Sequence, residues 1–157
     1  MKKLIFAVLF VLSVCIVGFL VALSYIQEAA RASAEHERPC DSYQIVKWTS
    51  VISKEGKYQL GKIYSRGVCF DQNISRAKEL YATVYSDNSI KIARALFHDA
   101  IQLADFGVRN PQIRNPENVR LLLEESKKMG FQPSDSELEE LAGRGISSLF
   151  TDYVPSN

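Results

Sequence analysis

The chain has 157 residues, the size of one domain, with 46% hydrophobic residues, 24% charged residues and a formal net charge of +1 at pH 7. This composition is ordinary for a folded protein. Beyond Lys2 and Lys3 lie 17 of the 19 basic residues and all 18 acidic residues, so that part is close to neutral. Because it has no basic stripe to neutralise phosphates, nucleic acid is not an expected partner.

Residues 4–26 form an uncharged segment directly after Met1, Lys2 and Lys3, with no proline and one glycine. A helix of 23 apolar residues is long enough to cross the roughly 30 Å hydrocarbon core of a bilayer. We therefore expect residues 1–26 to be a transmembrane signal anchor. The alternative is a signal peptide that is cleaved after export, but cleaved signals usually have a shorter apolar region, of about 7–15 residues.

Short basic N-terminal tips usually stay in the cytoplasm, which puts the bulk of the chain outside it. That compartment is a periplasm if the cell is Gram-negative, or the endoplasmic reticulum lumen if it is eukaryotic. Once Cys15 is assigned to the apolar segment, Cys40 and Cys69 remain. A disulfide between them is the simplest expectation in an oxidising compartment, and two free thiols are the alternative.

Residues 27–40 are rich in alanine and charge, and we expect a juxtamembrane stalk that ends near Pro39. Every segment of residues 41–157 has helical spacing, and none alternates long enough to indicate a strand. The first helix follows a cap at Asp41 and ends at Gly56. Its apolar positions at helical spacing are Ile45, Val46, Thr49 and Ile52, with Tyr43 and Trp48 at their margins.

Five further helices are expected in the rest of the chain. The second runs from about residue 57 to 66 and stops at Gly67. The third helix is capped by Asp71 or Asn73, and the fourth and longest starts at Asn88 or Ser89 and ends at Gly107. The fifth starts at Asn115–Pro116 and ends at Gly130, and the last starts with a capping box of Ser134 and Glu137. We expect residues 146–154 to fold back and cap the stack.

An internal repeat includes Gly61, which lies inside the second helix although glycine costs roughly 1 kcal/mol relative to alanine there. The pattern Leu60, Gly61, Tyr64, Gly67 and Val68 recurs loosely forty residues later as Ala100, Ile101, Ala104, Gly107 and Val108. Each unit reads as a helical hairpin.

The hairpin signature is carried by Leu60, Gly61, Tyr64, Gly67, Asp71, Ala77 and Tyr81, with Gly107 in the second unit. With these residues the chain resembles the SEL-one-like repeat family, relatives of the tetratricopeptide repeats. The match is good over residues 56–86 and weaker over 93–130, where Ile101 and Ala104 replace the glycine and the tyrosine. The resemblance implies an all-α fold, a short right-handed stack of antiparallel helical hairpins, here preceded by one transmembrane helix. It also implies that Gly61 lets the second helix of its hairpin approach closely, with the small Ala77 opposite.

No catalytic or metal-ligating constellation stands out, so we expect no enzyme, no cofactor, no metal and no small-molecule substrate. His36 lies in the stalk, and His98 and its neighbour Asp99 point to different parts of the helix surface. Cys40 and Cys69 lack the spacing of metal ligands.

The resemblance implies protein binding, because stacked helical repeats commonly present binding surfaces. Our first hypothesis is a membrane-anchored, non-catalytic interaction module, an adaptor or regulator, that exposes its repeats outside the cytoplasm. The alternative, also implied by the resemblance, is a periplasmic immunity protein that neutralises a secreted toxic effector such as a lipase. The candidate partner-binding residues are aromatic side chains that look less committed to the core: Tyr43, Trp48, Tyr85 and Phe131.

Overall fold

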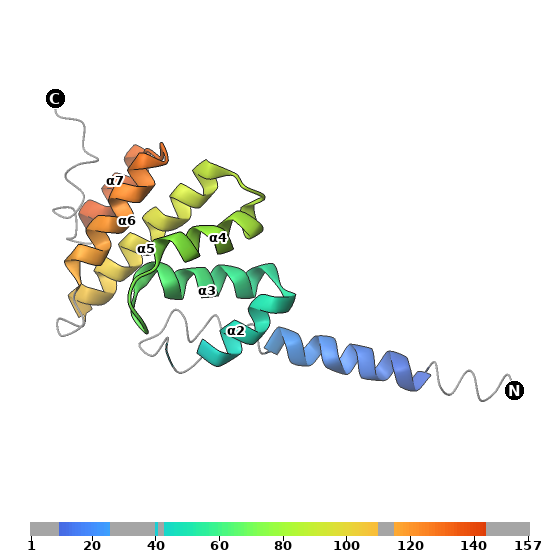
Figure 1. The fold of residues 1–157 in the computed structure, drawn as a ribbon. Coiled ribbons are helices and arrows are strands. Elements are labelled where there is room, and N and C mark those ends of the chain that lie inside the picture. The colour runs from blue at the N-terminus through green and yellow to red at the C-terminus, as the bar shows by residue number, and fades with distance from the viewer. Residues whose placement is uncertain (1–9, 26–39, 41–42, 110–114, 144–157) are drawn as a thin grey trace, which may run out of the picture.

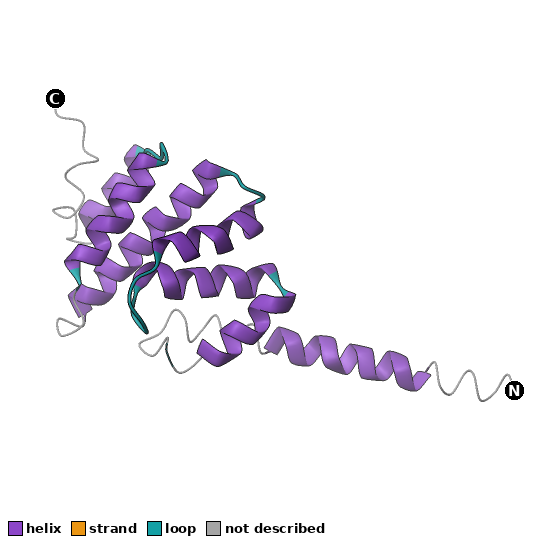
Figure 2. Cartoon of the chain, viewed as in Figure 1, coloured by secondary structure: helices purple, strands orange, loops and turns teal. Residues whose placement is uncertain are grey.

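The computed structural model describes residues 10–25, 40, 43–109 and 115–143 (Figure 1). These residues form helices and no strand (Figure 2), which confirms the all-α class. An N-terminal helix covers residues 10–25. The helices that follow are α2 (Tyr43–Ile52), α3 (Lys54–Arg66), α4 (Ile74–Tyr85), α5 (Ser89–Arg109), α6 (Pro116–Lys128) and α7 (Asp135–Gly143).

Within the described ranges, no helix is both long enough and apolar enough to cross a membrane. The expected transmembrane segment at 4–26 begins and ends outside these ranges. The expected stalk, apart from Cys40, and the expected fold-back of residues 146–154 also lie outside them.

The helices pack as consecutive hairpins. α2 packs on α3, α3 pairs with α4, and α5 pairs with α6, while contacts of α5 with α3 and α4 join the two hairpins (Figure 1). α3 therefore separates α2 from α4, and α2 lies at one end of the stack. A small apolar cluster of Val46, Leu60, Ile63 and Leu80 fastens this end, and a larger cluster fills the space among α4, α5 and α6.

Local capping sets most helix boundaries, as the sequence predicts. The side chain of Asn73 accepts a hydrogen bond from Arg76 N–H at 2.9 Å, and that of Asn115 accepts one from Asn118 N–H at 3.1 Å. Before α7, Ser134 N–H donates to Glu137 Oε2 at 2.7 Å, which is one half of the expected capping box. At the end of α3, Gly67 takes the left-handed conformation with φ 64°.

Two expected boundaries were wrong. α2 ends at Ile52 instead of Gly56, because Ser53 is extended and its hydroxyl accepts a hydrogen bond from Gly56 N–H at 2.9 Å, which starts α3 early. α5 does not end at Gly107 but continues to Arg109. The physical reason is that Gly107 is buried and extends the small-residue face of Ala100 and Ala104, so the helix gains packing by continuing.

Glycines allow two close helix contacts, one between α3 and α4 and one between α2 and α3. A Cβ added to Gly61 would lie 2.4 Å from Tyr81 Cε1, so close approach of α4 is confirmed, but the group opposite is Tyr81 and not Ala77. Tyr81 follows Ala77 by one helical turn, and its ring fills the space that the glycine leaves. A Cβ added to Gly56 would lie 2.3 Å from the carbonyl carbon of Thr49, so the first turn of α3 abuts the backbone of α2.

Candidate interaction surface

α2 carries apolar residues on two sides. The side towards α3 buries Val46, Thr49 and Ser50. On the other side, the exposed fractions are 42% for Ile45, 76% for Trp48, 77% for Val51 and 61% for Ile52. We call these four residues the outer face of α2. Because they are spaced by three, three and one residues, they form one continuous stripe along the helix.

Three constraints hold α2 in this orientation. Val46 is fully buried in the cluster with Leu60 and Ile63 of α3. The approach of Gly56 to the backbone of Thr49 leaves no room for α2 to shift inward. At the start of α2, the expected disulfide joins Cys40 to Cys69, with a Cα–Cα distance of 5.2 Å. The helix is fixed at both ends, with its outer face turned towards solvent.

Aromatic rings surround the disulfide end of α2. The ring of Tyr43 packs edge-on against Phe70, with centroids 4.7 Å apart, and Tyr64 lies 6.1 Å from the same ring. Tyr43 N–H donates to the carbonyl of Cys40 at 3.2 Å. Tyr43, half-buried, therefore serves packing at the disulfide, although sequence reasoning treated it as a candidate anchor for a partner.

The other aromatic candidates are placed very differently from one another. Among the described residues of α2 to α7, Trp48 is the most exposed aromatic side chain. Tyr85 is half-buried, with its ring 6.4 Å from those of Tyr58 and Tyr81. Phe131 is only 3% exposed and packs on Phe97, so its assignment as a surface anchor was wrong.

A helix terminus explains the burial of Phe131. Gly130 ends α6 with φ 85°, its N–H donates to Lys127 O, and Phe131 N–H donates to Ser126 O at 3.2 Å. This is the Schellman arrangement, in which the residue after the glycine turns back onto the helix and makes an apolar contact. The glycine signal that predicted the end of α6 also directs the next side chain into the core.

Most residues of the repeat signature lie in the contact between α3 and α4. Leu60, Ala77 and Tyr81 are buried, and Tyr64 is half-buried. Asp71 is exposed in the loop between the two helices, where the neighbouring Gln72 makes the inter-helix hydrogen bonds. The side-chain amide nitrogen of Gln72 donates to Ser65 O at 2.7 Å and to Asn118 O at 3.0 Å, which joins the loop to α6.

A buried carboxylate connects three helices, and sequence reasoning missed it. Asp99 of α5 is 1% exposed, and it accepts hydrogen bonds from the hydroxyls of Ser65 in α3 and Tyr81 in α4. Arg66 Nη2 lies 3.5 Å from its other carboxylate oxygen. The expectation that Asp99 points to the helix surface was wrong. The available signal was its spacing, because Asp99 follows Leu96 by three residues and precedes Leu103 by four, within the apolar stripe.

The network keeps its phenols protonated. Burial raises the pKa of Tyr81 well above its ordinary value, and the nearby Asp99 carboxylate raises it further. The pKa of Tyr58 is also raised, chiefly by burial and next by Asp99. Both groups therefore stay neutral, and Tyr81 remains a hydrogen-bond donor to Asp99 through the physiological pH range.

His98 lies on the surface of α5. Its side chain is 47% exposed, and its Nε2 is 3.9 Å from Glu137 Oε1. Among the residues that the structure describes, no group of three histidine, cysteine, aspartate or glutamate side chains could hold a metal ion.

No family model, curated protein or solved structure matches the chain.

Proposed function

We propose that this chain is a membrane-anchored, non-catalytic protein-interaction module whose helical hairpins lie outside the cytoplasm. The observation that carries the proposal is the exposure of the N-terminal helix. Of residues 10–25, all but Leu23 are exposed, and the exposed fractions of Phe10, Phe19 and Tyr25 are 70%, 63% and 76%. A helix that is apolar on every side is stable when protein or lipid surrounds it.

The sequence on either side of this helix favours lipid. With residues 4–9 and Ile26, the apolar run reaches the length that a bilayer requires. Lys2 and Lys3 before it favour a cytoplasmic N-terminus and an exported domain. The disulfide between Cys40 and Cys69 supports the same orientation, because disulfides persist in oxidising compartments.

A SEL-one-like hairpin stack is the architecture that we propose for the exported part. The tight fit of Gly61 against Tyr81 and the pairing of α3 with α4 and α5 with α6 support it. In stacks of this kind each hairpin contacts mainly its neighbours, which leaves long helix surfaces for a protein partner.

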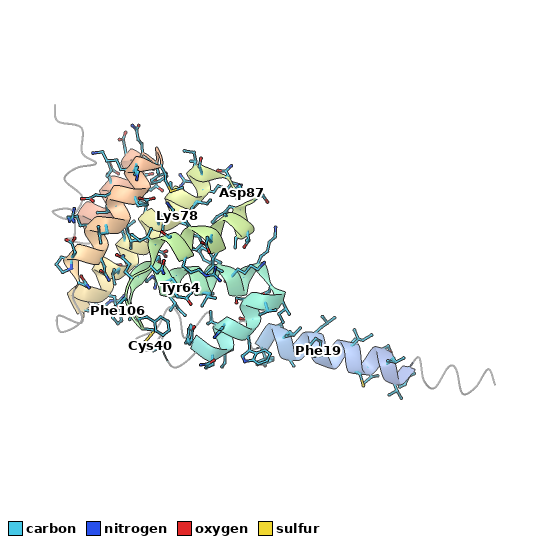
Figure 3. The ribbon with its side chains drawn as sticks, in the orientation of Figure 1. Phe19, Cys40, Tyr64, Lys78, Asp87 and Phe106 are labelled. Carbon is cyan, nitrogen blue, oxygen red and sulfur yellow. A yellow bond between two sulfur atoms is a disulfide. The ribbon has the colours of Figure 1, made fainter. Side chains whose placement is uncertain are left out.

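The partner-binding surface that we propose is the edge of the stack at the turn between α4 and α5, formed by Tyr85 and Ile90. Ile90 is 51% exposed, and the half-buried Tyr85 is backed by other tyrosine rings. Ser86 and Asp87 between them both have positive φ, and Asp87 N–H donates to Ala82 O at 3.0 Å, so the turn is well defined. Rigid aromatic side chains at such edges lose little entropy on binding. In Figure 3, Asp87 marks this turn and Cys40 the end of the stack near α2.

The anchor is tested by alkaline extraction of membranes that contain the full-length protein. We expect the wild type to stay in the membrane pellet, and a variant with Val14→Arg and Val17→Arg to be released, because a charge at the centre of a span is costly. Intact mass measurement of the pelleted protein shows whether the N-terminal segment is retained. Release of the wild type into the supernatant would contradict the anchor.

Protein binding is tested by crosslinking in cells, detergent extraction, pull-down and mass spectrometry. We expect one dominant partner at equal stoichiometry, lost in Tyr85→Ala and in Ile90→Asp. Thr83→Ala is the matched control, because Thr83 is exposed on the same helix and its hydroxyl bonds only within the helix, to Leu80 O. Absence of a specific partner for the wild type would refute the interaction function.

A further inference from the structure

We propose that the outer face of α2 rests on the surface of the bilayer that holds the N-terminal segment, with Trp48 at the level of the lipid headgroups. This inference depends on the membrane anchor proposed above. The face presents Ile45, Trp48, Val51 and Ile52, the last three more than 60% exposed, from a helix whose other side is packed on α3.

The shape and composition of the face suit a lipid surface. From Ile45 to Ile52 the stripe covers about 10 Å of helix, and it belongs to one helix at the end of the stack. A bilayer interface requires no complementary pocket, whereas a protein partner has to enclose such a ridge. The indole of Trp48 has an apolar body and one polar N–H, the combination that favours the headgroup region.

The charges around the face fit anionic headgroups. α2 contains no carboxylate, and Lys47, next to Trp48, is exposed. Lys54, directly after the cap of α3, is exposed as well. Of the two carboxylates that flank α2 in sequence, Glu55 accepts a hydrogen bond from the amide of Gln59 at 2.7 Å, and Asp41 lies outside the described residues. Basic residues beside an exposed apolar stripe are typical of helices that lie in the membrane interface.

The length of the connecting chain keeps this face near the bilayer. Residues 27–39 join the apolar segment to Cys40, and 13 residues reach at most roughly 45 Å when fully extended. The disulfide fixes the end of this connection to the domain, and α2 begins three residues after Cys40. A weak apolar contact is enough to hold α2 on the bilayer, because the tether makes binding to the bilayer intramolecular. The edge at Tyr85 and Ile90, on the far side of α3, stays available to a protein.

Trp48 is the single tryptophan of the chain, so its fluorescence tests the proposal directly. The full-length protein is reconstituted into vesicles of phosphatidylcholine mixed with phosphatidylglycerol, and flotation first establishes that the protein is held by the vesicles. We then expect phospholipids brominated near the headgroup to quench Trp48, and aqueous iodide to quench it several-fold less than it quenches free tryptophan. The matched control carries Trp48→Phe and Ile90→Trp, and its emission should be quenched by iodide and not by brominated lipid.

Further results separate the possible occupants of the face and test the anchor. Lys47→Glu with Lys54→Glu should reduce quenching by brominated lipid in the mixed vesicles and much less in pure phosphatidylcholine. Strong iodide quenching of Trp48 without lipid quenching, in protein that floats with the vesicles, would overturn the inference and leave the anchor intact. Protection of Trp48 that disappears when the protein is diluted in the membrane would assign the face to a second copy. Failure of the wild type to float would instead remove the anchor itself.

Discussion

Gly61→Ala tests the close approach of Tyr81 in α4 to the backbone of α3. The added Cβ would lie 2.4 Å from Cε1, 2.9 Å from Cδ1 and 3.0 Å from Cζ of Tyr81. The ring is fully buried, and its hydroxyl donates to the buried carboxylate of Asp99. Tyr81 therefore cannot move aside without disturbing the contact that joins α4 to α5.

The expected loss combines three effects. Overpacking of a core typically costs about 1–3 kcal/mol. Loss of a hydrogen bond to a charged group adds about 1.5–3 kcal/mol if the ring shifts far enough to break it. The higher helix propensity of alanine stabilises the folded state by about 1 kcal/mol relative to glycine. The free energy of unfolding should fall by about 1.5–5 kcal/mol if the hydrogen bond breaks, and by about 0–2 kcal/mol if it survives.

Urea unfolding of the full-length oxidised protein in detergent, followed by far-ultraviolet circular dichroism, measures this change. The matched control is the same substitution in a Tyr81→Leu background, where the ring is absent. There, Gly61→Ala should be neutral or stabilising by up to about 1 kcal/mol, so the two substitutions should couple strongly. A Gly61→Ala protein that is more stable than the wild type by about 1 kcal/mol, the gain expected from helix propensity alone, would refute the close contact.

Three other predictions concern the buried network and the disulfide. Asp99→Leu should destabilise the fold by about 3–5 kcal/mol in the same urea assay, because it leaves the buried hydroxyl of Tyr81 without its acceptor and breaks a buried charge pair with Arg66. The raised pKa of Tyr81 contributes stability that is fully present below its unfolded pKa of about 10 and is lost as pH rises beyond it. Urea unfolding between about pH 8 and 11 should therefore show a fall that Tyr81→Phe reduces. Replacing Cys40 and Cys69 by serine should cost about 3–4 kcal/mol and lower Tm, and a reductant should lower the Tm of the wild type alone; equal Tm values would argue against a stabilising bridge.

Helix boundaries were predictable where the signal is local. Asn73, Asn115 and Ser134 each cap a helix through bonds to residues three positions away, so the sequence alone contains the whole interaction. Gly56 misled the prediction because its role is tertiary. Glycine is there for the close approach to the backbone of Thr49, and only the packed structure shows that it does not end α2.

The candidate surface was predictable only in part, for the same reason. α2 has apolar residues on both sides, so periodicity could not decide which side is buried, and it grouped Ile45 and Ile52 with Val46 as one face. The structure buries Val46 and exposes the other two. Similarly, the pattern of α5 fixed its apolar stripe but could not show that Asp99, within that stripe, meets donors from α3 and α4.

The constraints on α2 bear directly on what covers its outer face. A helix held by one contact could rotate and bury Trp48, but α2 is held by the disulfide at Cys40, by the burial of Val46 and by the backbone contact at Gly56. Each constraint fixes the same orientation, so local repacking cannot hide the outer face without breaking one of them. Cover has to come from outside the hairpin stack, and with the membrane anchor that we propose the bilayer lies at the other end of a connection of 13 residues. If the disulfide is reduced, α2 loses one of its three attachments, and quenching of Trp48 by brominated lipid should change while flotation of the protein does not.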